Sequence, residues 1–330
     1  MRLTLKDIKS ITHGAVKITE NDGKFSFFRF SDEQYEFYKA TNAAFANKAL
    51  GTASVILDFY TDSDTLSIDW SAKKVSTRDY CCFDVYENGV MVGHFGNSTA
   101  DAELSGSEHF ALSEGKNRIT VYLPALYAGY ISSLELDDGA SLEPIKRGTR
   151  ALIVGDSITQ GYDAIYPSLS YANLTVSEFG FEAVNQAIGG EVFNHGMLGT
   201  SPVIDAEIIT VAYGTNDWSK TQTLELIKDS AEKFFTKLKS IYPKARIFYI
   251  SPIWRKDIGA MKPSGDFYSA VSALKEIAKG AGAVVIDGVN LIPHDAGVFA
   301  DGRLHPNDLG FTQYAKSLAR ELIAHGVEKK

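Results

Sequence analysis

The sequence predicts a chain of two parts, a β-sandwich followed by an α/β domain with a parallel sheet. Residues 1 to about 140 carry short alternating patterns rich in β-branched and aromatic residues, and few long helical patterns. From residue 151 the pattern changes to strand, helix and strand, with unbroken apolar runs typical of parallel strands covered on both faces. A chain of 330 residues also exceeds the usual size of one hydrophobic core. We therefore predict a sandwich of jelly-roll type over residues 1–147 and a three-layer α/β/α domain over residues 148–330.

The first part is predicted to consist of short strands joined by turns. A hairpin is indicated by Asn88-Gly89, a pair that tolerates the positive φ angles of a type I′ turn. One short helix is expected at 32–40, and the segment 137–148 has the turn and linker residues of a domain boundary. Aromatic residues in a sandwich usually belong to the core, so a sugar-stacking surface is the less favoured alternative for them. The predicted strands are 24–30, 54–60, 65–70, 82–86, 90–95, 117–123 and 131–136.

The second part is predicted to be a doubly wound sheet. Apolar residues that recur every three or four positions indicate helices at 224–241, 267–278 and 311–322. Pro243 follows the first of these helices as a stop signal. The predicted strands are 151–154, 183–187, 208–212, 246–250 and 283–286.

Composition excludes several classes of partner. The formal net charge is −8, and Lys and Arg are scattered, which argues against nucleic acid or an anionic membrane as the main partner. The N-terminus lacks the apolar core of a signal peptide and no later run could span a bilayer, so we expect a cytoplasmic protein. The two cysteines, Cys81 and Cys82, are neighbours that would point to opposite faces of a strand, which favours two small buried side chains over a disulfide.

Polar residues follow the predicted parallel strands. Ser157 lies just after the first strand, Gly189-Gly190 after the second and Asn216 after the third, while His305 follows the fifth through a longer loop. In open α/β sheets the ligand crevice lies outside the carboxyl ends of the strands, so we expect these residues to converge on one edge.

This set of residue types indicates a serine nucleophile that attacks an acyl group. A serine hydroxyl is a weak nucleophile that needs a base, and His305 can accept its proton and return it to the leaving alcohol. The N–H groups of Ser157 and Gly190 and the amide of Asn216 could stabilise the tetrahedral oxyanion, each donor contributing about 3 kcal/mol.

These residues resemble the four blocks that define the GDSL or SGNH hydrolase family. The blocks are GDSI at 155–158, NQAIGG at 185–190, GTND at 214–217 and HPND at 305–308, in the family's order over roughly 148–330. The resemblance implies a flavodoxin-like SGNH fold, with Ser157 as nucleophile, Gly190 and Asn216 as oxyanion donors and His305 as base.

The last block departs from the family pattern. The family usually places an aspartate three positions before the histidine, whereas here Asp301 stands four before His305 and Gly302 occupies the expected place. A flexible Asp-Gly turn could absorb the extra residue, so we predict that Asp301 orients His305. A backbone carbonyl or another carboxylate is the alternative.

Longer strings suggest a substrate class. GDSITQGYDA, SYANL, NQAIGG and VAYGTNDW, behind a β-rich first part, look like the two-domain bacterial branch of the family, which resembles carbohydrate acetylesterases. That resemblance implies hydrolysis of short acyl esters, often acetyl, of a carbohydrate or glycoside. Trp218 and Trp254 are candidates for a wall around the substrate, with core packing as the alternative. Asp156 is a further candidate for substrate binding, although hydrogen bonding that shapes the loop is the more favoured role for Asp156 and Asp217.

No residue cluster has the spacing of a zinc, EF-hand or dinucleotide site, so we expect no metal and no cofactor. Two other functions stay open, namely a carbohydrate-binding protein with a weakly active hydrolase domain, and acyl transfer to a sugar hydroxyl. Association into a homo-oligomer is also left open.

Overall fold

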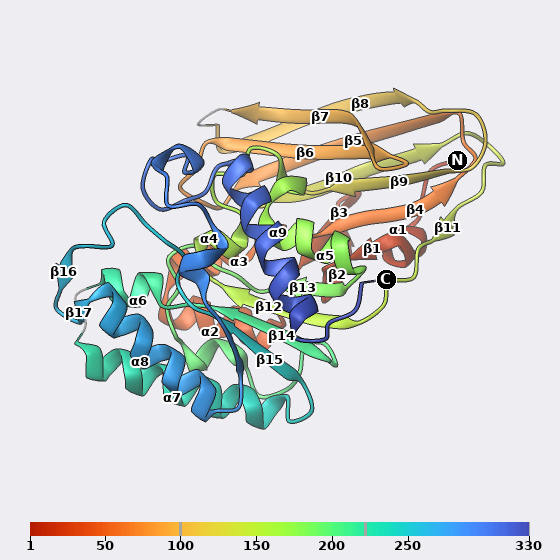
Figure 1. Cartoon of the computed structure of the whole chain (residues 1–330). Coiled ribbons are helices and arrows are strands. Elements are labelled where there is room, and N and C mark those ends of the chain that lie inside the picture. Colours follow the sequence, from red (N-terminus) through yellow and green to blue (C-terminus); the bar gives the residue numbers. More distant parts are fainter. Residues whose placement is uncertain (99–100, 221–222, 330) are drawn as a thin grey trace.

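Two antiparallel sheets face each other in the N-terminal half of the computed structural model, which describes residues 1–98, 101–220 and 223–329 (Figure 1). One sheet has the order β1-β4-β9-β6-β7, with β11 also paired to β4: β1 (Thr12–His13), β4 (Ile56–Thr61), β6 (Tyr80–Glu87), β7 (Val90–Ser98), β9 (Asn117–Tyr122) and β11 (Glu143–Pro144). The other has the order β2-β3-β10-β5-β8: β2 (Lys17–Asn21), β3 (Lys24–Phe28), β5 (Thr65–Lys74), β8 (Glu103–Ala111) and β10 (Tyr127–Leu136). Apolar side chains from both sheets form one buried cluster, as expected for a sandwich.

The predicted turn at Asn88-Gly89 has the expected geometry, because both residues have positive φ angles of 51° and 82°. Cys81 and Cys82 are buried free thiols on β6, so no disulfide joins them. This half contains α1 (Leu5–Ile11), α2 (Asp32–Thr41) and α3 (Ala43–Ala49). The helix predicted at 32–40 corresponds to α2, and the other two were not predicted. Each of the three begins at a side chain that caps its first turn, for example Asn42 at α3.

A five-stranded parallel sheet forms the middle layer of the C-terminal half. Its order is β13-β12-β14-β15-β18, which in chain order is the flavodoxin-like sequence 2-1-3-4-5 and confirms the predicted fold class. The strands are β12 (Arg150–Gly155), β13 (Glu182–Asn185), β14 (Ile208–Ala212), β15 (Arg246–Ile250) and β18 (Val284–Ile286). A small hairpin with two residues in each strand, β16 (Met261–Lys262) and β17 (Gly265–Asp266), lies apart from this sheet.

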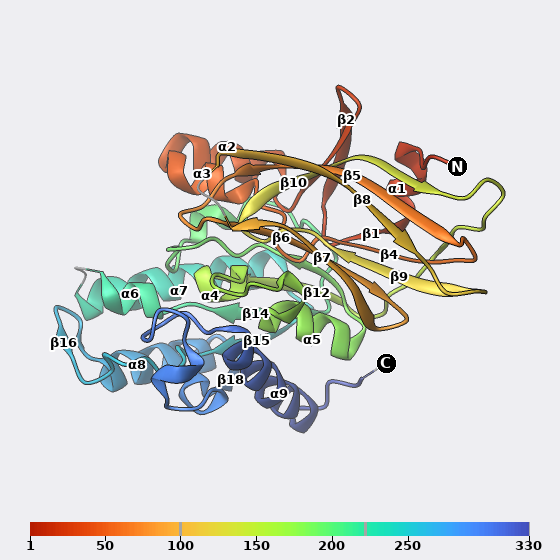
Figure 2. The same cartoon turned by 90° about the horizontal axis from the view of Figure 1, so that it is seen from above.

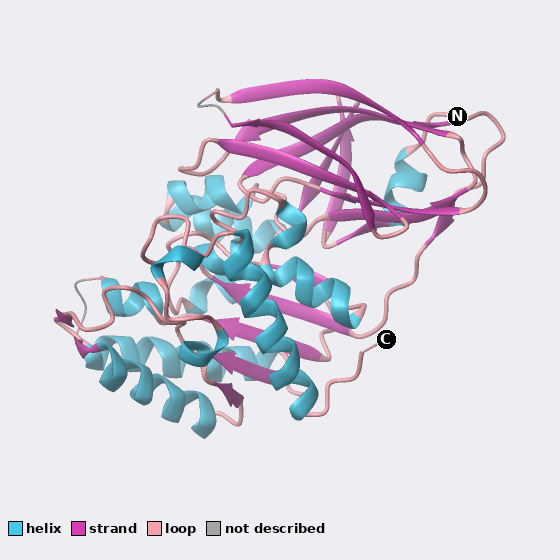
Figure 3. Ribbon diagram, turned by 45° about the horizontal axis from the view of Figure 1, so that its top comes forward, coloured by secondary structure: helices cyan, strands magenta, loops and turns pink. Residues whose placement is uncertain are grey.

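Helices cover both faces of the parallel sheet (Figure 3). One face packs against α5 (Tyr171–Phe179) and α9 (Asp308–Ala324), and the other against α7 (Leu224–Ile241) and α8 (Phe267–Gly280). The helix α5 was not predicted, because its sequence YANLTVSEF contains a β-branched pair and little 3.6-residue periodicity. Two short helices, α4 (Ser157–Gln160) and α6 (Thr215–Ser219), follow β12 and β14 directly.

The two halves share a core. Phe30, Tyr38, Ala46 and Ala49 belong to the same buried cluster as the face of the parallel sheet that packs against α7 and α8. Figure 2 shows α2 and α3 next to each other at one end of the sandwich. None of the helices in the described part of the chain is long and apolar enough to cross a membrane.

Candidate active site

Ser157 lies at the exit of β12, the second strand in the order of the parallel sheet, and in the first turn of α4. Asp156 caps this helix, and its Oδ1 accepts a hydrogen bond from the Ile158 N–H at 3.0 Å. Gly155 is required by close packing, because an added Cβ would lie 2.2 Å from Thr159 Oγ1. The turn therefore holds Ser157 in a defined position, although its side chain is largely buried.

His305 and Asp301 form a hydrogen-bonded chain with Ser157. Ser157 Oγ lies 2.9 Å from His305 Nε2, and His305 Nδ1 lies 2.9 Å from Asp301 Oδ2. The other carboxylate oxygen of Asp301 accepts the backbone N–H groups of Arg303, Leu304 and His305 at 2.9, 2.7 and 3.1 Å.

The extra residue between Asp301 and His305 is absorbed by this turn. Gly302 has a φ of 65°, a left-handed angle that glycine adopts without strain. Burial raises the pKa of Asp301, but the hydrogen bonds from the Leu304 N–H, the His305 side chain and neighbouring N–H groups outweigh it and hold the pKa at about 2. Asp301 is therefore a carboxylate at any pH at which His305 could act as a base.

The two remaining oxyanion candidates lie on adjoining loops. Asn216 Nδ2 donates to the Glu191 carbonyl at 3.0 Å and to Asp156 Oδ2 at 3.3 Å. Glu191 follows Gly190 and Asp156 precedes Ser157, so these two bonds join the three loops that carry the predicted donors, namely the N–H groups of Ser157 and Gly190 and the amide of Asn216.

The loop that carries Gly190 is held from several sides. Gly189 must be glycine, because an added Cβ would lie 2.5 Å from the ring of Tyr162. The Gly189 N–H donates to Gln160 Oε1 at 2.8 Å, and its carbonyl accepts the Lys48 ammonium at 2.6 Å. Lys220 Nζ donates to the Gly190 carbonyl at 3.0 Å. Lys48 was not predicted, and it comes from α3 in the N-terminal half.

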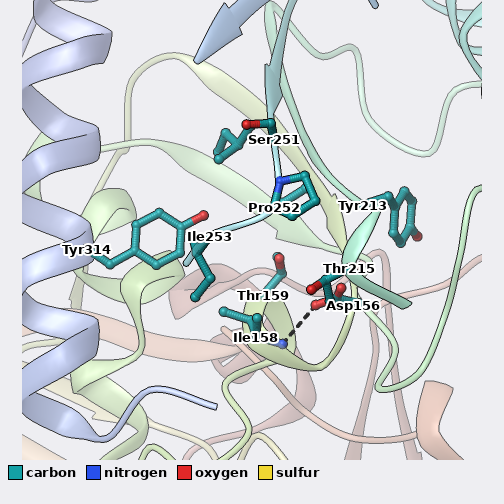
Figure 4. Close-up of a pocket in the computed structure, with 11 residues that line it drawn as sticks. Asp156, Ile158, Thr159, Tyr213, Thr215, Ser251, Pro252, Ile253 and Tyr314 are labelled. Carbon is teal, nitrogen blue, oxygen red and sulfur yellow. Dashed lines mark hydrogen bonds between the residues drawn. The ribbon is translucent and has the colours of Figure 1, made fainter. Parts of the chain in front are cut away.

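Asp156 lines a small space beside the site. A cavity of about 20 Å³, room for about one water molecule, lies between Asp156, Thr215 and Tyr314 (Figure 4). Burial raises the pKa of Asp156 to about 7, and the charge of Asp217 adds to the shift. Burial likewise raises the pKa of Asp217 to about 6, despite a hydrogen bond from the Phe193 N–H. Asp156 has a relative exposure of 3%, and its role in shaping the loop stays a prediction.

These raised pKa values predict a pH-dependent stability. In the unfolded chain Asp156 has its ordinary pKa of 3.8, so between pH 4 and pH 7 the folded state binds more protons than the unfolded state. The free energy of unfolding should therefore fall as pH rises through this range, and in Asp156→Asn this fall should be smaller by about 2 kcal/mol. Urea unfolding of both proteins at pH 5 and pH 8 measures this difference, and an unchanged pH dependence in the variant would contradict it.

A second carboxylate lies beside His305. Asp163 Oδ2 is 3.6 Å from His305 Nδ1, and Asp163 also forms a bidentate ion pair with Arg78 from the N-terminal half. Arg78 Nη2 is itself 3.4 Å from His305 Nδ1, and the ring of Tyr162 stacks on the imidazole at 5.9 Å. Sequence reasoning missed Asp163 although it lies in the quoted string GDSITQGYDA, and nothing in the sequence marked Arg78.

The aromatic candidates are mostly in the core. Trp218 is 1% exposed and packs edge-on against Phe267 at 5.2 Å, so its burial favours the packing alternative over a substrate wall. Trp254 is partly buried and stacks on His294 at 5.5 Å. In the sandwich, Trp70, Tyr122 and Tyr127 are all buried, which leaves them no sugar-stacking surface.

Within the described residues, one group of side chains has ligand atoms close enough for a metal ion, namely Asp163, Asp301 and His305. Arg78 supplies a positive charge to this group, and His305 is hydrogen-bonded at both ring nitrogens. The hydrogen-bonded arrangement therefore accounts for the group without a metal, and the absence of a cofactor stays a prediction.

Part of the chain is similar in sequence to a family of hydrolases. Residues 153–312 match the model of the GDSL-like Lipase/Acylhydrolase family. No curated protein sequence is significantly similar to the chain. Many solved structures match the chain, among them the following three.

The first is a salicylyl-acyltransferase from a tetracycline biosynthetic pathway, with a TM-score of 0.74, 21% identity and coverage of 96% of this chain and 94% of that chain. The second is a putative GDSL-like lipase from Bacteroides ovatus, with a TM-score of 0.76, 16% identity and coverage of 100% and 99%. The third is a family two carbohydrate esterase from Clostridium thermocellum in complex with cellohexaose, with a TM-score of 0.62, 16% identity and coverage of 83% and 93%.

At these identities the likeness establishes a shared fold. Together with the family match, it shows that residues 153–312 form a GDSL-like lipase/acylhydrolase domain of the SGNH fold, preceded by a β-rich N-terminal half.

Proposed function

We propose that the protein is a serine esterase that hydrolyses short-chain, preferably acetyl, esters of carbohydrates through an acyl-enzyme on Ser157. The observation that carries this proposal is the continuous chain of contacts Asp301, His305 and Ser157, with both bonds at 2.9 Å. The GDSL family match supports ester hydrolysis as the class of reaction.

The reaction proceeds in two half-reactions. His305 Nε2 takes the proton of Ser157 Oγ while that oxygen attacks the ester carbonyl, and the imidazolium then gives the proton to the leaving alcohol. His305 next activates a water molecule that attacks the acyl-enzyme, which releases the carboxylic acid and restores the serine. Asp301 stays ionised throughout and stabilises the imidazolium through Nδ1.

The negative charge that forms on the carbonyl oxygen is stabilised by the N–H groups of Ser157 and Gly190 and by Asn216 Nδ2. The bond from Asn216 to Asp156 is the longer of its two, at 3.3 Å, and is the one that the oxyanion would replace. Donors of this kind typically contribute about 3 kcal/mol each to transition-state stabilisation.

The carbohydrate part of the proposal is supported by the likeness in fold to a carbohydrate esterase whose structure contains cellohexaose. A second candidate function is acyl transfer to an alcohol, and it is favoured by the likeness to a salicylyl-acyltransferase over nearly the whole chain. The two functions share the acyl-enzyme and differ in whether water or an alcohol attacks it.

The test is a panel of p-nitrophenyl acetate, butyrate and octanoate, with an acetylated xylo-oligosaccharide alongside. The expected result is turnover that declines with acyl length, release of acetate from the oligosaccharide, and an acyl adduct on the peptide that contains Ser157. Adding a sugar alcohol as acceptor separates the candidates, because a transferase would form a new ester at the expense of free acetate. No turnover and no adduct with any ester would refute both.

The role of Asp301 can be measured with Asp301→Ala. Loss of the 2.9 Å bond to Nδ1 leaves the imidazole less well oriented and its charge less stabilised, so kcat should fall by about 10- to 1000-fold. Asp163 remains 3.6 Å from the same nitrogen, but its charge is paired with Arg78, so it should replace Asp301 only in part. A loss of less than about tenfold would mean that Asp163 or another group orients His305.

A further inference from the structure

The contact between Arg78 and Asp163 joins the two halves of the chain beside His305. Arg78 lies in the loop between β5 and β6, and its Nε and Nη2 donate to the two oxygens of Asp163 at 2.6 and 2.9 Å. The Tyr80 hydroxyl donates to the same carboxylate. The side chain of Asp163 is only 9% exposed, so these bonds are poorly screened by solvent. Asp163 is held at a φ of 71°, an uncommon backbone angle for a residue other than glycine.

Groups of opposite charge, two carboxylates and one guanidinium, surround the imidazole of His305. Facing His305 are the carboxylates of Asp301 and Asp163, the guanidinium of Arg78, the ring of Tyr162 and the hydroxyl of Ser157. Two carboxylates alone would favour the protonated imidazole strongly, and a protonated His305 cannot accept the serine proton. Arg78 neutralises one of them, which leaves Asp301 as the net negative charge at Nδ1.

We propose that Arg78 and Asp163 are positioning residues of the esterase, a charge-compensated pair that fixes the ring of His305 and keeps it able to accept a proton. The N-terminal half would then be part of the catalytic machinery through Arg78, besides any role in binding a substrate. This inference rests on the proposed role of His305 as general base.

Removing the positive charge of Arg78 and removing the negative charge of Asp163 should move the pH profile of kcat/KM in opposite directions. Arg78→Met leaves Asp163 uncompensated, which favours the imidazolium, so the acid limb of kcat/KM should move to higher pH by about one pH unit. Asp163→Asn leaves the guanidinium 3.4 Å from Nδ1, which disfavours the imidazolium, so the acid limb should move to lower pH by a similar amount. The double variant should return the limb to near its original position.

The opposite signs separate this role from a purely structural one. A pair that merely held the halves together would lower activity or stability in every variant without moving the midpoint in opposite directions. Arg118→Met is a matched control, because Arg118 forms a similar bidentate pair with Asp58, at 2.9 and 2.8 Å, and has no contact with His305. If Arg78→Met does not fold, Arg78→Lys, which keeps the charge, should keep the acid limb in place while Asp163→Asn still lowers it.

An NMR titration of the His305 ring in the resting proteins, assigned with His305→Gln, tests the same charges without turnover. Failure of the proposed function would appear as no ester turnover with the titration shifts still opposite in sign. Failure of the present inference would appear as normal turnover with midpoints that stay unchanged or move in the same direction in both single variants.

Discussion

Replacing Ser157 with alanine is expected to lower kcat for p-nitrophenyl acetate by at least about 10⁴-fold, while the protein stays folded. The substitution removes only the hydroxyl group. Without it, His305 has no nucleophile to activate at 2.9 Å from Nε2. The oxyanion donors would remain and could still assist direct attack by water, so a small residual rate is expected rather than none. Initial rates with purified enzyme, together with the loss of the acyl adduct, measure this effect.

The control for this substitution is Ser105→Ala on the exposed strand β8, which removes a hydroxyl far from the site. It should change neither kcat nor the unfolding midpoint. If Ser157→Ala retained more than about a tenth of the activity, another residue would be the nucleophile, and the Asp301, His305 and Ser157 contacts would need a different explanation.

Much of the site could be predicted because its residues follow strand ends. The unbroken apolar run before Ser157 and the run before Asn216 mark two buried parallel strands, and the carboxyl ends of such strands meet at one edge. The observed strand β14 coincides with the predicted 208–212. The place of Asp301 could be predicted as well, because an Asp-Gly turn is local chemistry that a short sequence segment encodes.

The remaining residues of the site could not be predicted because they are joined only by the tertiary fold. Arg78 lies in an irregular loop with no periodicity and meets its partner Asp163 across 85 positions of the chain. Lys48 reaches the Gly189 carbonyl across 141 positions, from a seven-residue helix with no strong apolar pattern. Trp218 is a different case, since its place after a strand left a substrate wall and core packing both open, and α8 buries it.

Arg29 shows how strongly the two halves are coupled. It is fully buried at the end of β3, and no ion pair accompanies it in the described residues. Its guanidinium instead donates to four backbone carbonyls: Gly51 at 2.5 Å, Ala187 at 3.2 Å, Lys48 at 3.4 Å, and Asn185. Two of these carbonyls belong to the NQAIGG block that leads to Gly190, so a side chain of the N-terminal half fixes the backbone of the oxyanion loop.

Arg29→Ala should therefore damage stability and activity together. It leaves buried carbonyls without donors and opens a cavity, which should lower the free energy of unfolding by about 3–5 kcal/mol. It should also lower kcat more than it raises KM, because the Gly190 N–H acts mainly on the transition state. Urea unfolding and steady-state kinetics at 15 °C measure both effects.

Two further variants separate the causes. Arg29→Met fills most of the space without donating hydrogen bonds, whereas Arg29→Lys keeps a charged donor. If the hydrogen bonds to the loop matter, Arg29→Met should regain stability relative to Arg29→Ala but not kcat, and Arg29→Lys should regain part of both. If Arg29→Met regained kcat as fully as stability, Arg29 would act only by filling space, and the shape of the oxyanion loop would be set by the C-terminal half and Lys48 alone.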